Sequence, residues 1–328
     1  MNEQDYGLVV GIRRYPGMPP ELEGAENDAR AFHEWLVSEK GGGLLESHTR
    51  LLLASGSTCE DACPTDKQLE NWLTPLYLRA KKKGRAGRRL YLFFAGHGFS
   101  PGRHEAAIYM ADASEDLPGR HVPGKAYADF FLLSVFFEEV VLFMDCCRRD
   151  GLMVGIRGVP WPEQRVETAE ELTKYFYAFG TYWGGVSLER MMGSRKHGLF
   201  TSTLLEGLEG KAANSKGEIT SRSLQDYLER KVPLLCQGNE RQEPRFDASP
   251  RPIVFGRVPV PDFPVRVLST APGQLILRKG ELAEVMTGDP RVKTPEGWST
   301  RLPRGLYEAE LGTETKFFRV EGETDVRL

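Results

Sequence analysis

The sequence lacks any apolar run of the roughly 20 residues that a membrane-spanning helix requires. It also begins with the acidic segment Met-Asn-Glu-Gln-Asp, whereas a secretory signal starts with a basic segment and continues with an apolar one. These absences argue against a membrane partner, and they predict a soluble protein of the cytoplasm.

Cysteine is scarce, and neither sign of charge dominates. The five cysteines, two of them adjacent, fit reduced thiols better than a disulfide framework. Cys59 and Cys63 have no second Cys or His pair at zinc spacing, so we assign no metal site. The 43 Lys and Arg against 46 Asp and Glu give a net charge of −3, which argues against a dedicated nucleic-acid partner.

Segments of strand and helix character alternate along most of the 328 residues, 40% of which are hydrophobic. This order predicts an α/β domain with a mainly parallel sheet and helices on both of its faces. The expected strands are 6–12, 49–53, 90–95, 140–147, 175–181 and an edge strand at 252–255, and the expected helices are 22–36, 65–80, 126–139, 198–208 and 221–232.

The composition changes from Pro259, where Pro-Val-Pro-Asp-Phe-Pro reads as a stiff linker. We therefore expect two domains, residues 1–257 and residues 258–328. The second has short alternating runs separated by glycine and proline, which predicts a small all-β domain of sandwich type. It carries no catalytic constellation, so we expect it to dock a partner such as an activating or inhibiting protein. The expected runs are 265–268, 274–277, 307–311 and 316–320.

Two apolar runs of strand length end in reactive groups. Residues 140–147 read Val-Val-Leu-Phe-Met-Asp-Cys-Cys, and residues 90–95 are followed by Gly-His-Gly. The carboxyl ends of strands in a parallel sheet are where ligands bind. If the two strands are neighbours, His97 lies close enough to Cys147 to deprotonate or orient its thiol.

Each of these features alone has a plainer interpretation. A Cys at a strand end is more often a small buried hydrophobe, and Gly-His-Gly is often only a turn. Together, after two separate apolar strands, they favour a nucleophile with its base. Gly98 has no Cβ, so a substrate carbonyl can approach the backbone and its N–H can act as an oxyanion donor.

The segments Tyr-Leu-Phe-Phe-Ala-Gly-His-Gly at 91–98 and Leu-Phe-Met-Asp-Cys-Cys at 142–147 resemble the caspase and metacaspase peptidases, over roughly residues 5–256. The resemblance implies that Cys147 is the nucleophile, that His97 is the base, and that the N–H groups of Gly98 and Cys147 hold the oxyanion. It further implies a cysteine endopeptidase of the caspase-like fold that acts on protein substrates, without a required cofactor or a third triad member. Regulated activation in stress, cell death or immunity is also what the family suggests.

The segment Leu-Glu-Gly-Ala-Glu-Asn-Asp-Ala at 22–29 resembles a metacaspase segment. In metacaspases the aspartates matching Asp28 and Asp145 line the pocket for the residue before the cut and favour Arg or Lys there. A carboxylate pair attracts a guanidinium or ammonium group and repels a substrate carboxylate. Metacaspases commonly carry a small polar or thiol residue at the positions of Ala25 and Ala95, so this sequence departs from them there.

Other interpretations of these carboxylates stay open. Asp28 could be a first-turn residue favoured by the helix dipole, and Asp145 could accept backbone bonds in a turn. Caspases place an Arg near the position of Leu22 to hold a substrate Asp, so an Asp preference is the alternative specificity. A catalytically silent scaffold that acts by binding is the alternative from another class.

Residues 148–171 form a polar, Pro-containing linker. In caspase-like enzymes this is where the chain is cut during activation, and Arg149, Arg157 and Arg165 are the candidate sites. The basic run at 79–89 invites a nucleic-acid interpretation, but a solvated helix end that continues into a flexible, cleavable loop fits it better.

Calcium stays open as a cofactor, because several metacaspases need it. The loop at 101–125 carries Asp112, Glu115 and Asp116, whose oxygens suit this cation. Their spacing matches no calcium-binding loop, so the sequence maps no calcium site.

Overall fold

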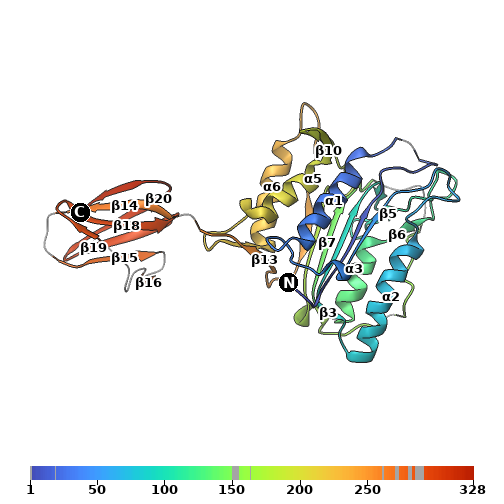
Figure 1. The fold of residues 1–328 in the computed structure, drawn as a ribbon, viewed down its shortest axis with the longest axis horizontal. Coiled ribbons are helices and arrows are strands. Elements are labelled where there is room, and N and C mark those ends of the chain that lie inside the picture. The colour runs from blue at the N-terminus through green and yellow to red at the C-terminus, as the bar shows by residue number, and fades with distance from the viewer. Residues whose placement is uncertain are drawn as a thin grey trace. The chain divides into compact units, whose positions relative to one another are not determined.

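The computed structural model describes residues 2–18, 20–149, 155–162, 164–260, 262–269, 273–279, 283–284 and 292–328. The chain divides into two compact units (Figure 1). The first comprises residues 1–213 and 219–256, and the second comprises residues 214–218 and 257–328.

A six-stranded sheet forms the centre of the first unit (Figure 1). Every neighbouring pair in it is parallel except β12 and β8, which are antiparallel at one edge. The predicted mainly parallel sheet is therefore confirmed. In spatial order the strands are β12 (Arg245–Ala248), β8 (Lys174–Phe179), β7 (Phe137–Asp145), β3 (Gly87–Ala95), β1 (Asp5–Gly11) and β2 (Thr49–Leu53).

Helices cover both faces of this sheet, as predicted (Figure 1). One face carries α1 (Glu23–Val37), α5 (Leu199–Glu206) and α6 (Ser221–Leu234). The other carries α2 (Asp66–Lys83) and α3 (Gly124–Leu133). The short elements are α4 (Ala169–Leu172), the 3-10 turn Glu46–His48, the π turn Gly207–Lys211, and the small sheets β4 (Gly98–Phe99) with β5 (Ala107–Tyr109) and β6 (His121–Val122), β9 (Glu189–Met192) with β10 (Arg195–Gly198), and β11 (Glu218–Thr220) with β13 (Val254–Arg257).

The alternation of side chains along the strands explains which helix packs on which face. Successive strand residues point to opposite faces of a sheet. Leu92 and Leu142 accordingly join the core that includes the buried leucines of α2. Phe93, one residue further along, stacks on Phe32 of α1 with ring centroids 4.5 Å apart.

Two predicted elements are wrong. The helix expected over 126–139 ends at Leu133, and Val135 then adopts a φ of 56°, after which β7 begins at Phe137. The buried aromatics at this junction fit a helical period and a strand equally well. The strand near 252–255 pairs with β11 outside the main sheet, whose real edge is β12. The segment of β12, Arg-Phe-Asp-Ala, has no apolar run that could have indicated a strand.

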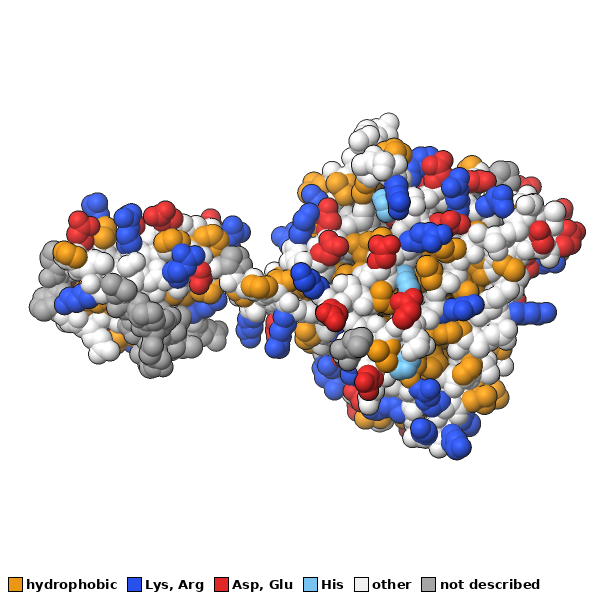
Figure 2. All heavy atoms as spheres, viewed as in Figure 1, with side chains coloured by type: hydrophobic (Ala, Val, Ile, Leu, Met, Phe, Trp, Pro, Cys, Tyr) orange, Lys and Arg blue, Asp and Glu red, His pale blue; other side chains and the backbone are white. Residues whose placement is uncertain are grey.

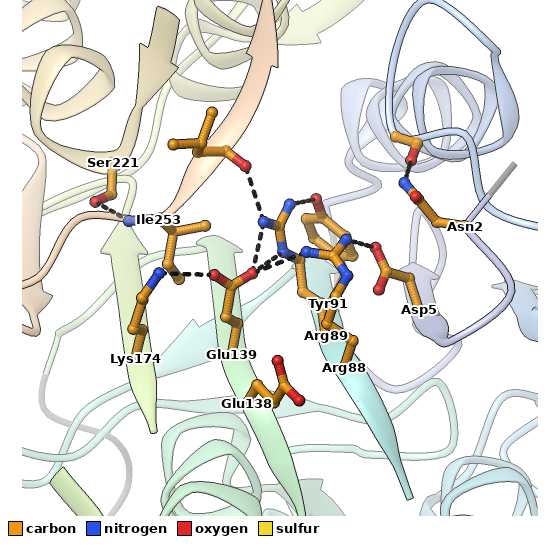
Figure 3. A network of polar contacts seen from close by, with 12 residues as sticks. Asn2, Asp5, Arg88, Arg89, Tyr91, Glu138, Glu139, Lys174, Ser221 and Ile253 are labelled. Carbon is orange, nitrogen blue, oxygen red and sulfur yellow. Dashed lines mark hydrogen bonds and ion pairs between the residues drawn. The ribbon is translucent and has the colours of Figure 1, made fainter. Parts of the chain in front are cut away.

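The basic run at 79–89 also differs from the prediction in its second half. Helix α2 ends at Lys83 with its last-turn lysines exposed, and β3 begins at Gly87. Arg89 is only 4% exposed, and its Nε donates to Oε2 of Glu139 at 2.7 Å (Figure 3). Arg88 pairs with Asp5 and with Glu139 (Figure 3). These arginines therefore belong to the sheet and not to a flexible, cleavable loop.

We expect the substitution Arg89→Met to lower the free energy of unfolding by roughly 3 kcal/mol, because it leaves Glu139 with less compensation in a buried site. Arg88 and Lys174 remain near Glu139, so the expected loss of free energy of unfolding lies at the lower end of the range for breaking a buried ion pair. The control Arg85→Met removes an exposed pair with Glu138 and should cost less than about 0.5 kcal/mol. Urea unfolding of both variants measures the difference. Equal losses of unfolding free energy would contradict the assignment of Arg89 to a buried ion pair in the sheet.

The second unit is built of β-strands, which confirms the predicted small all-β domain. Two four-stranded sheets share one core that includes Val267, Leu277 and Tyr307. The sequence patterns above omit β18, although its alternate residues point inward. The strands are β14 (Asp262–Leu268), β15 (Leu275–Lys279), β16 (Ala283–Glu284), β17 (Val292–Thr294), β18 (Gly297–Pro303), β19 (Gly305–Leu311), β20 (Glu314–Val320) and β21 (Thr324–Arg327).

The surface carries charges of both signs. On the face drawn in Figure 2, Lys and Arg side chains are interspersed with Asp and Glu side chains over the described residues. Within the described part of the chain, no helix is both long enough and apolar enough to cross a membrane.

Candidate active site

The parallel register of β3 and β7 brings His97 and Cys147 to the same level of the sheet. Ala95 is paired with Asp145, and the N–H of Gly96 donates to the Asp145 carbonyl at 3.3 Å. His97 and Cys147 each follow two residues after these paired positions. Both line one narrow cavity of about 80 Å³. The structure thus brings together the thiol and the imidazole that the sequence placed after two separate strands.

The surroundings of His97 define its basic nitrogen. Nε2 lies 3.1 Å from the carbonyl oxygen of Pro20, and the backbone N–H of His97 donates to the Tyr15 hydroxyl at 2.9 Å. A carbonyl oxygen only accepts hydrogen bonds, so Nε2 carries the proton and Nδ1 is left as the base. Burial lowers the pKa of His97, which keeps the ring neutral near neutral pH. Sequence reasoning missed Pro20, because a backbone carbonyl leaves no residue-type signal.

The two adjacent cysteines have different environments. Cys146 is 2% exposed and belongs to the core on the α2 side of the sheet. Cys147 is partly exposed in the cavity. Burial raises the pKa of the Cys147 thiol, while the backbone N–H of Ser187 lowers it. Cys147 is therefore the accessible thiol of the pair, and it requires a base to ionise near neutral pH.

Gly98 has a packing role in addition to its predicted place beside the substrate. It begins β4 and pairs with Ile108 of β5. A Cβ at this position would lie 2.8 Å from Sγ of Cys146 and 2.7 Å from the carbonyl oxygen of Ala107. Only glycine lets the chain after His97 pass this close to the buried cysteine.

Asp28 and Asp145 face the same side of the sheet and meet beside the cavity. Asp28 is buried on α1, where its Oδ1 lies 2.8 Å from Nδ1 of His197 and its Oδ2 accepts from the Gly198 N–H at 2.8 Å. Asp145 Oδ2 accepts from the N–H of Thr201 at 3.0 Å and from its hydroxyl at 2.6 Å. The two carboxylates are thus held by the same short stretch of chain.

These contacts argue against the two local interpretations of the carboxylates, the helix dipole and the turn. Asp28 is the sixth residue of α1 and lies outside its first turn, whose acidic residues are Glu23 and Glu26. The partners of Asp145 lie 42 and 56 residues along the chain, so it does not close a local turn. Both carboxylates are tertiary features of the cavity wall.

Gly198 makes the carboxylate pair geometrically feasible. A Cβ there would overlap Oδ2 of Asp145 and lie 2.9 Å from Oδ2 of Asp28. Its φ of −64° is open to any residue, so space and not conformation requires glycine. The sequence indicated Gly198 only as the start of a helix.

Burial makes the carboxylates on this wall costly to ionise. Burial, with a contribution from Asp145, raises the pKa of Asp28 to about 7, against the lowering effect of its hydrogen bond to His197. Burial also raises the pKa of Asp145 and of Glu189, which lines the same cavity and accepts from the Gly24 N–H at 3.0 Å. A cation entering here would stabilise the ionised forms. Sequence reasoning missed Glu189 and His197, which no motif marked.

Residues 4–254 match the family model of the caspase domain of peptidase family C14. The chain belongs to this family. Over 223 residues it is 26% identical to a probable protease from a Desulfuromonadales bacterium, an alignment that covers 63% of this chain and 26% of that protein. The chain therefore spans only about a quarter of that relative. The crystal structure of caspase-1 from Spodoptera frugiperda aligns with a TM-score of 0.51 at 15% identity, over 78% of this chain and 91% of that one, which shows a shared fold.

Ala25 and Ala95, the departures from the metacaspase pattern, line the cavity of this caspase domain. Leu22, near the position where caspases carry an Arg, lines it as well. Their side chains offer no hydrogen bond to a substrate.

The described part of the linker in the caspase domain packs on α2 and α3. Trp161 is buried, and its Nε1 donates to the hydroxyl of Thr74 at 3.2 Å. The guanidinium of Arg157 pairs with Asp66. Arg165 is exposed, but both of its neighbours bond to the end of α3: the Gln164 carbonyl accepts from the Ser134 hydroxyl, and the Val166 N–H donates to the Leu133 carbonyl. Arg149 is exposed. Residues 150–154 lie outside the described residues.

The acidic loop residues do not converge on a metal position. Within the described ranges, no group of three His, Cys, Asp or Glu side chains is arranged to hold a metal ion. Asp112 pairs with Arg120 at 3.3 Å. All five cysteines, Cys59 and Cys63 included, are free thiols.

Proposed function

We propose that this caspase-domain protein is a cysteine endopeptidase that cleaves protein substrates after Arg or Lys. The observation that carries the proposal is the single cavity that joins Cys147 and His97 to the buried carboxylates Asp28 and Asp145. A nucleophile, a base and a pocket for a cation within one cavity are the parts that such a reaction needs.

The proposed reaction begins when Nδ1 of His97 takes the proton of the Cys147 thiol. The thiolate attacks the carbon of the scissile carbonyl, and the N–H groups of Gly98 and Cys147 hold the resulting oxyanion. His97 then gives its proton to the leaving amine, and water hydrolyses the thioester with His97 again acting as base. The Pro20 carbonyl, at 3.1 Å from Nε2, supports the imidazolium form while it exists.

The carboxylates account for the proposed specificity. A substrate guanidinium or ammonium beside Asp28, Asp145 and Glu189 would supply a counter-charge and so favour their ionised forms, which burial disfavours. A substrate Asp would add a further like charge, which costs several kcal/mol in a site of this kind. The alternative preference for Asp is therefore disfavoured.

The test is a panel of fluorogenic peptides that carry Arg, Lys or Asp before the reporter, each with and without calcium. We expect kcat/KM for the Arg and Lys peptides to exceed that for the Asp peptide by roughly 100-fold or more, because of like-charge repulsion. A preference for Asp would refute the pocket assignment. Silence toward every peptide would favour the catalytically silent scaffold instead. The calcium arm decides whether the cation is a cofactor.

We further propose that the protein is processed within the linker at 148–171. Incubation of the wild type is expected to produce two fragments, whereas the triple variant Arg149→Gln, Arg157→Gln, Arg165→Gln should stay intact. Mass spectrometry of the fragments identifies the cut. Arg85→Gln, an exposed arginine outside the linker, is the control and should be cut like the wild type. A wild-type chain that cleaves peptides and yet stays intact would contradict this proposal.

The cellular setting is proposed on the family alone. We place the protein in the cytoplasm, with activation in a stress, cell-death or immune response. The second unit would dock an activating or inhibiting protein. The interspersed charges on the face in Figure 2 support a protein partner over a nucleic acid.

A further inference from the structure

A second and larger cavity lies at the carboxyl edge of the sheet, where β8 ends at Phe179 and β12 begins at Arg245. Its volume is about 580 Å³, a size that suits a small-molecule ligand. Among the described residues, four cations line it, namely Arg103, Lys125, Arg148 and Arg245, against the single carboxylate of Asp247. This part of the first unit has no role in the proposed cleavage.

Arg148 is the most unusual residue of this cavity. It is 4% exposed, and within the described residues it forms no ion pair and its Nε has no hydrogen-bond partner. Its Nη2 donates only to uncharged oxygens, the carbonyls of Arg103 at 2.9 Å and of Glu105 at 3.2 Å and the hydroxyl of Ser100 at 3.5 Å. A buried charge without a counter-ion is costly. Arg89, equally buried, has Glu139 as its counter-ion, so Arg148 is the exception.

The other cations differ in how far they are compensated. Lys125 bonds to Asp129 at 2.8 Å and lies 3.9 Å from Asp247. Arg245 is exposed and lies 3.9 Å from Glu243. Arg103 forms no ion pair within the described residues and lies over the ring of Trp183, 5.7 Å from its centroid. Arg148 likewise lies over the ring of Phe179, 4.5 Å from its centroid. Among the described residues neither Arg103 nor Arg148 has an anionic partner, so both leave positive charge available to a ligand.

The wall of the cavity also offers an aromatic surface. Trp183 is 36% exposed, and its Nε1 donates to the Ser100 carbonyl at 3.1 Å, which fixes the indole. Tyr182 and Phe246 line the cavity beside it. A flat ring can stack on such a side chain, as bases stack on aromatic side chains in single-stranded nucleic-acid complexes. We infer that this cavity binds an anionic ligand that combines phosphate groups with a flat ring, which is the chemistry of a nucleotide.

The cavity is connected to the candidate active site through two stretches of backbone. Arg148 follows Cys147 directly, its N–H donates to the Gly185 carbonyl at 3.0 Å, and its carbonyl accepts from the Gly184 N–H at 2.7 Å. Ser187, a little further along, bonds to Asp145. A ligand that fixes this loop changes the rate of cleavage at Cys147. That consequence rests on the proposed function, whereas binding itself does not.

Isothermal titration calorimetry of the full chain with ATP, pyrophosphate and adenosine tests the inference without any measurement of cleavage. We expect one ATP per chain, weaker binding of pyrophosphate and no binding of adenosine. The double variant Arg103→Gln, Arg245→Gln should weaken ATP binding at least tenfold, and both arginines are exposed, so the fold is preserved. Trp183→Leu should weaken ATP binding but not pyrophosphate binding. Arg222→Gln, an exposed arginine on α6, is the control and should leave both unchanged.

Absence of ATP binding, or equal binding by the wild type and the double variant, would refute the site. Equal affinity for ATP and pyrophosphate would show that stacking of the ligand's flat ring on the aromatic wall does not contribute to binding, and would refute that part of the inference. If titration with a short RNA or DNA shows tighter binding than titration with ATP, the ligand of this cavity is a nucleic acid and the inference of a nucleotide is wrong. A chain that binds ATP but cleaves none of the fluorogenic peptides described above would refute the proposed function and leave the nucleotide site standing.

Discussion

Cys147→Ala is expected to lower kcat/KM for peptide cleavage by at least about a thousandfold, because loss of the nucleophile of a triad or dyad leaves only the contributions of binding and of the oxyanion site. His97→Ala should cost nearly as much, since the two residues act as one unit. Peptide hydrolysis by purified variants with matched circular dichroism spectra measures both effects.

Cys146→Ala is the matched control for this prediction. Cys146 is adjacent in sequence, but its side chain lies in the core on the opposite face of the sheet. Removing its buried sulfur should cost some stability and leave kcat/KM within about tenfold of the wild type. The reverse result, an active Cys147→Ala and an inactive Cys146→Ala, would overturn the assignment of the nucleophile.

Asp28→Asn is expected to lower kcat/KM for Arg and Lys peptides by roughly 100-fold, because a buried charge pair with the substrate is lost. Asparagine retains the shape of the side chain. Its oxygen can accept from the Gly198 N–H, and its NH2 group can donate to Nδ1 of His197 when that nitrogen carries no proton. Cleavage of a peptide with an uncharged residue at this position should change little. The effect is measured as the ratio of kcat/KM values for the two peptides.

The control for Asp28→Asn is Glu23→Gln on the same helix, which removes a partly exposed carboxylate paired with Lys196. It should leave the ratio unchanged. A loss that is equal for charged and uncharged peptides would show that Asp28 is structural and does not contact the substrate.

The same carboxylate gives the cleavage of Arg peptides a specific pH dependence. The pKa of Asp28 is raised to about 7 by burial, so its side chain is mostly neutral below that pH. Binding of a cation needs the ionised form, so kcat/KM for an Arg peptide should rise as the pH increases through about 7. The pKa of His97 is lowered, so its deprotonation is complete at lower pH. Asp28→Asn should abolish the rise near pH 7, as a profile from about pH 5 to about pH 9 would show.

The sequence by itself determined the order of the main strands and helices along the chain. It also determined two of the groups that meet at the site, the imidazole of His97 and the thiol of Cys147. Local patterns decide these, because β3 and β7 contain apolar runs of strand length that are rich in aromatic or β-branched residues, and His97 and Cys147 lie just beyond their ends. Where one segment fits two periods, as at 134–139, the same reasoning fails. Tertiary packing then decides the outcome.

Only the tertiary structure decided the partners of the site residues. Asp28 and His197 are 169 residues apart in the sequence, yet their side chains lie 2.8 Å apart. The imidazole of His97 is oriented by the backbone carbonyl of Pro20, a group that any residue type could supply. The basic run provided Arg89 for a buried pair with Glu139, whereas Arg148 is buried without such a partner among the residues that the structure describes. Charge compensation depends on which side chains the fold brings together, and no local pattern encodes those distances.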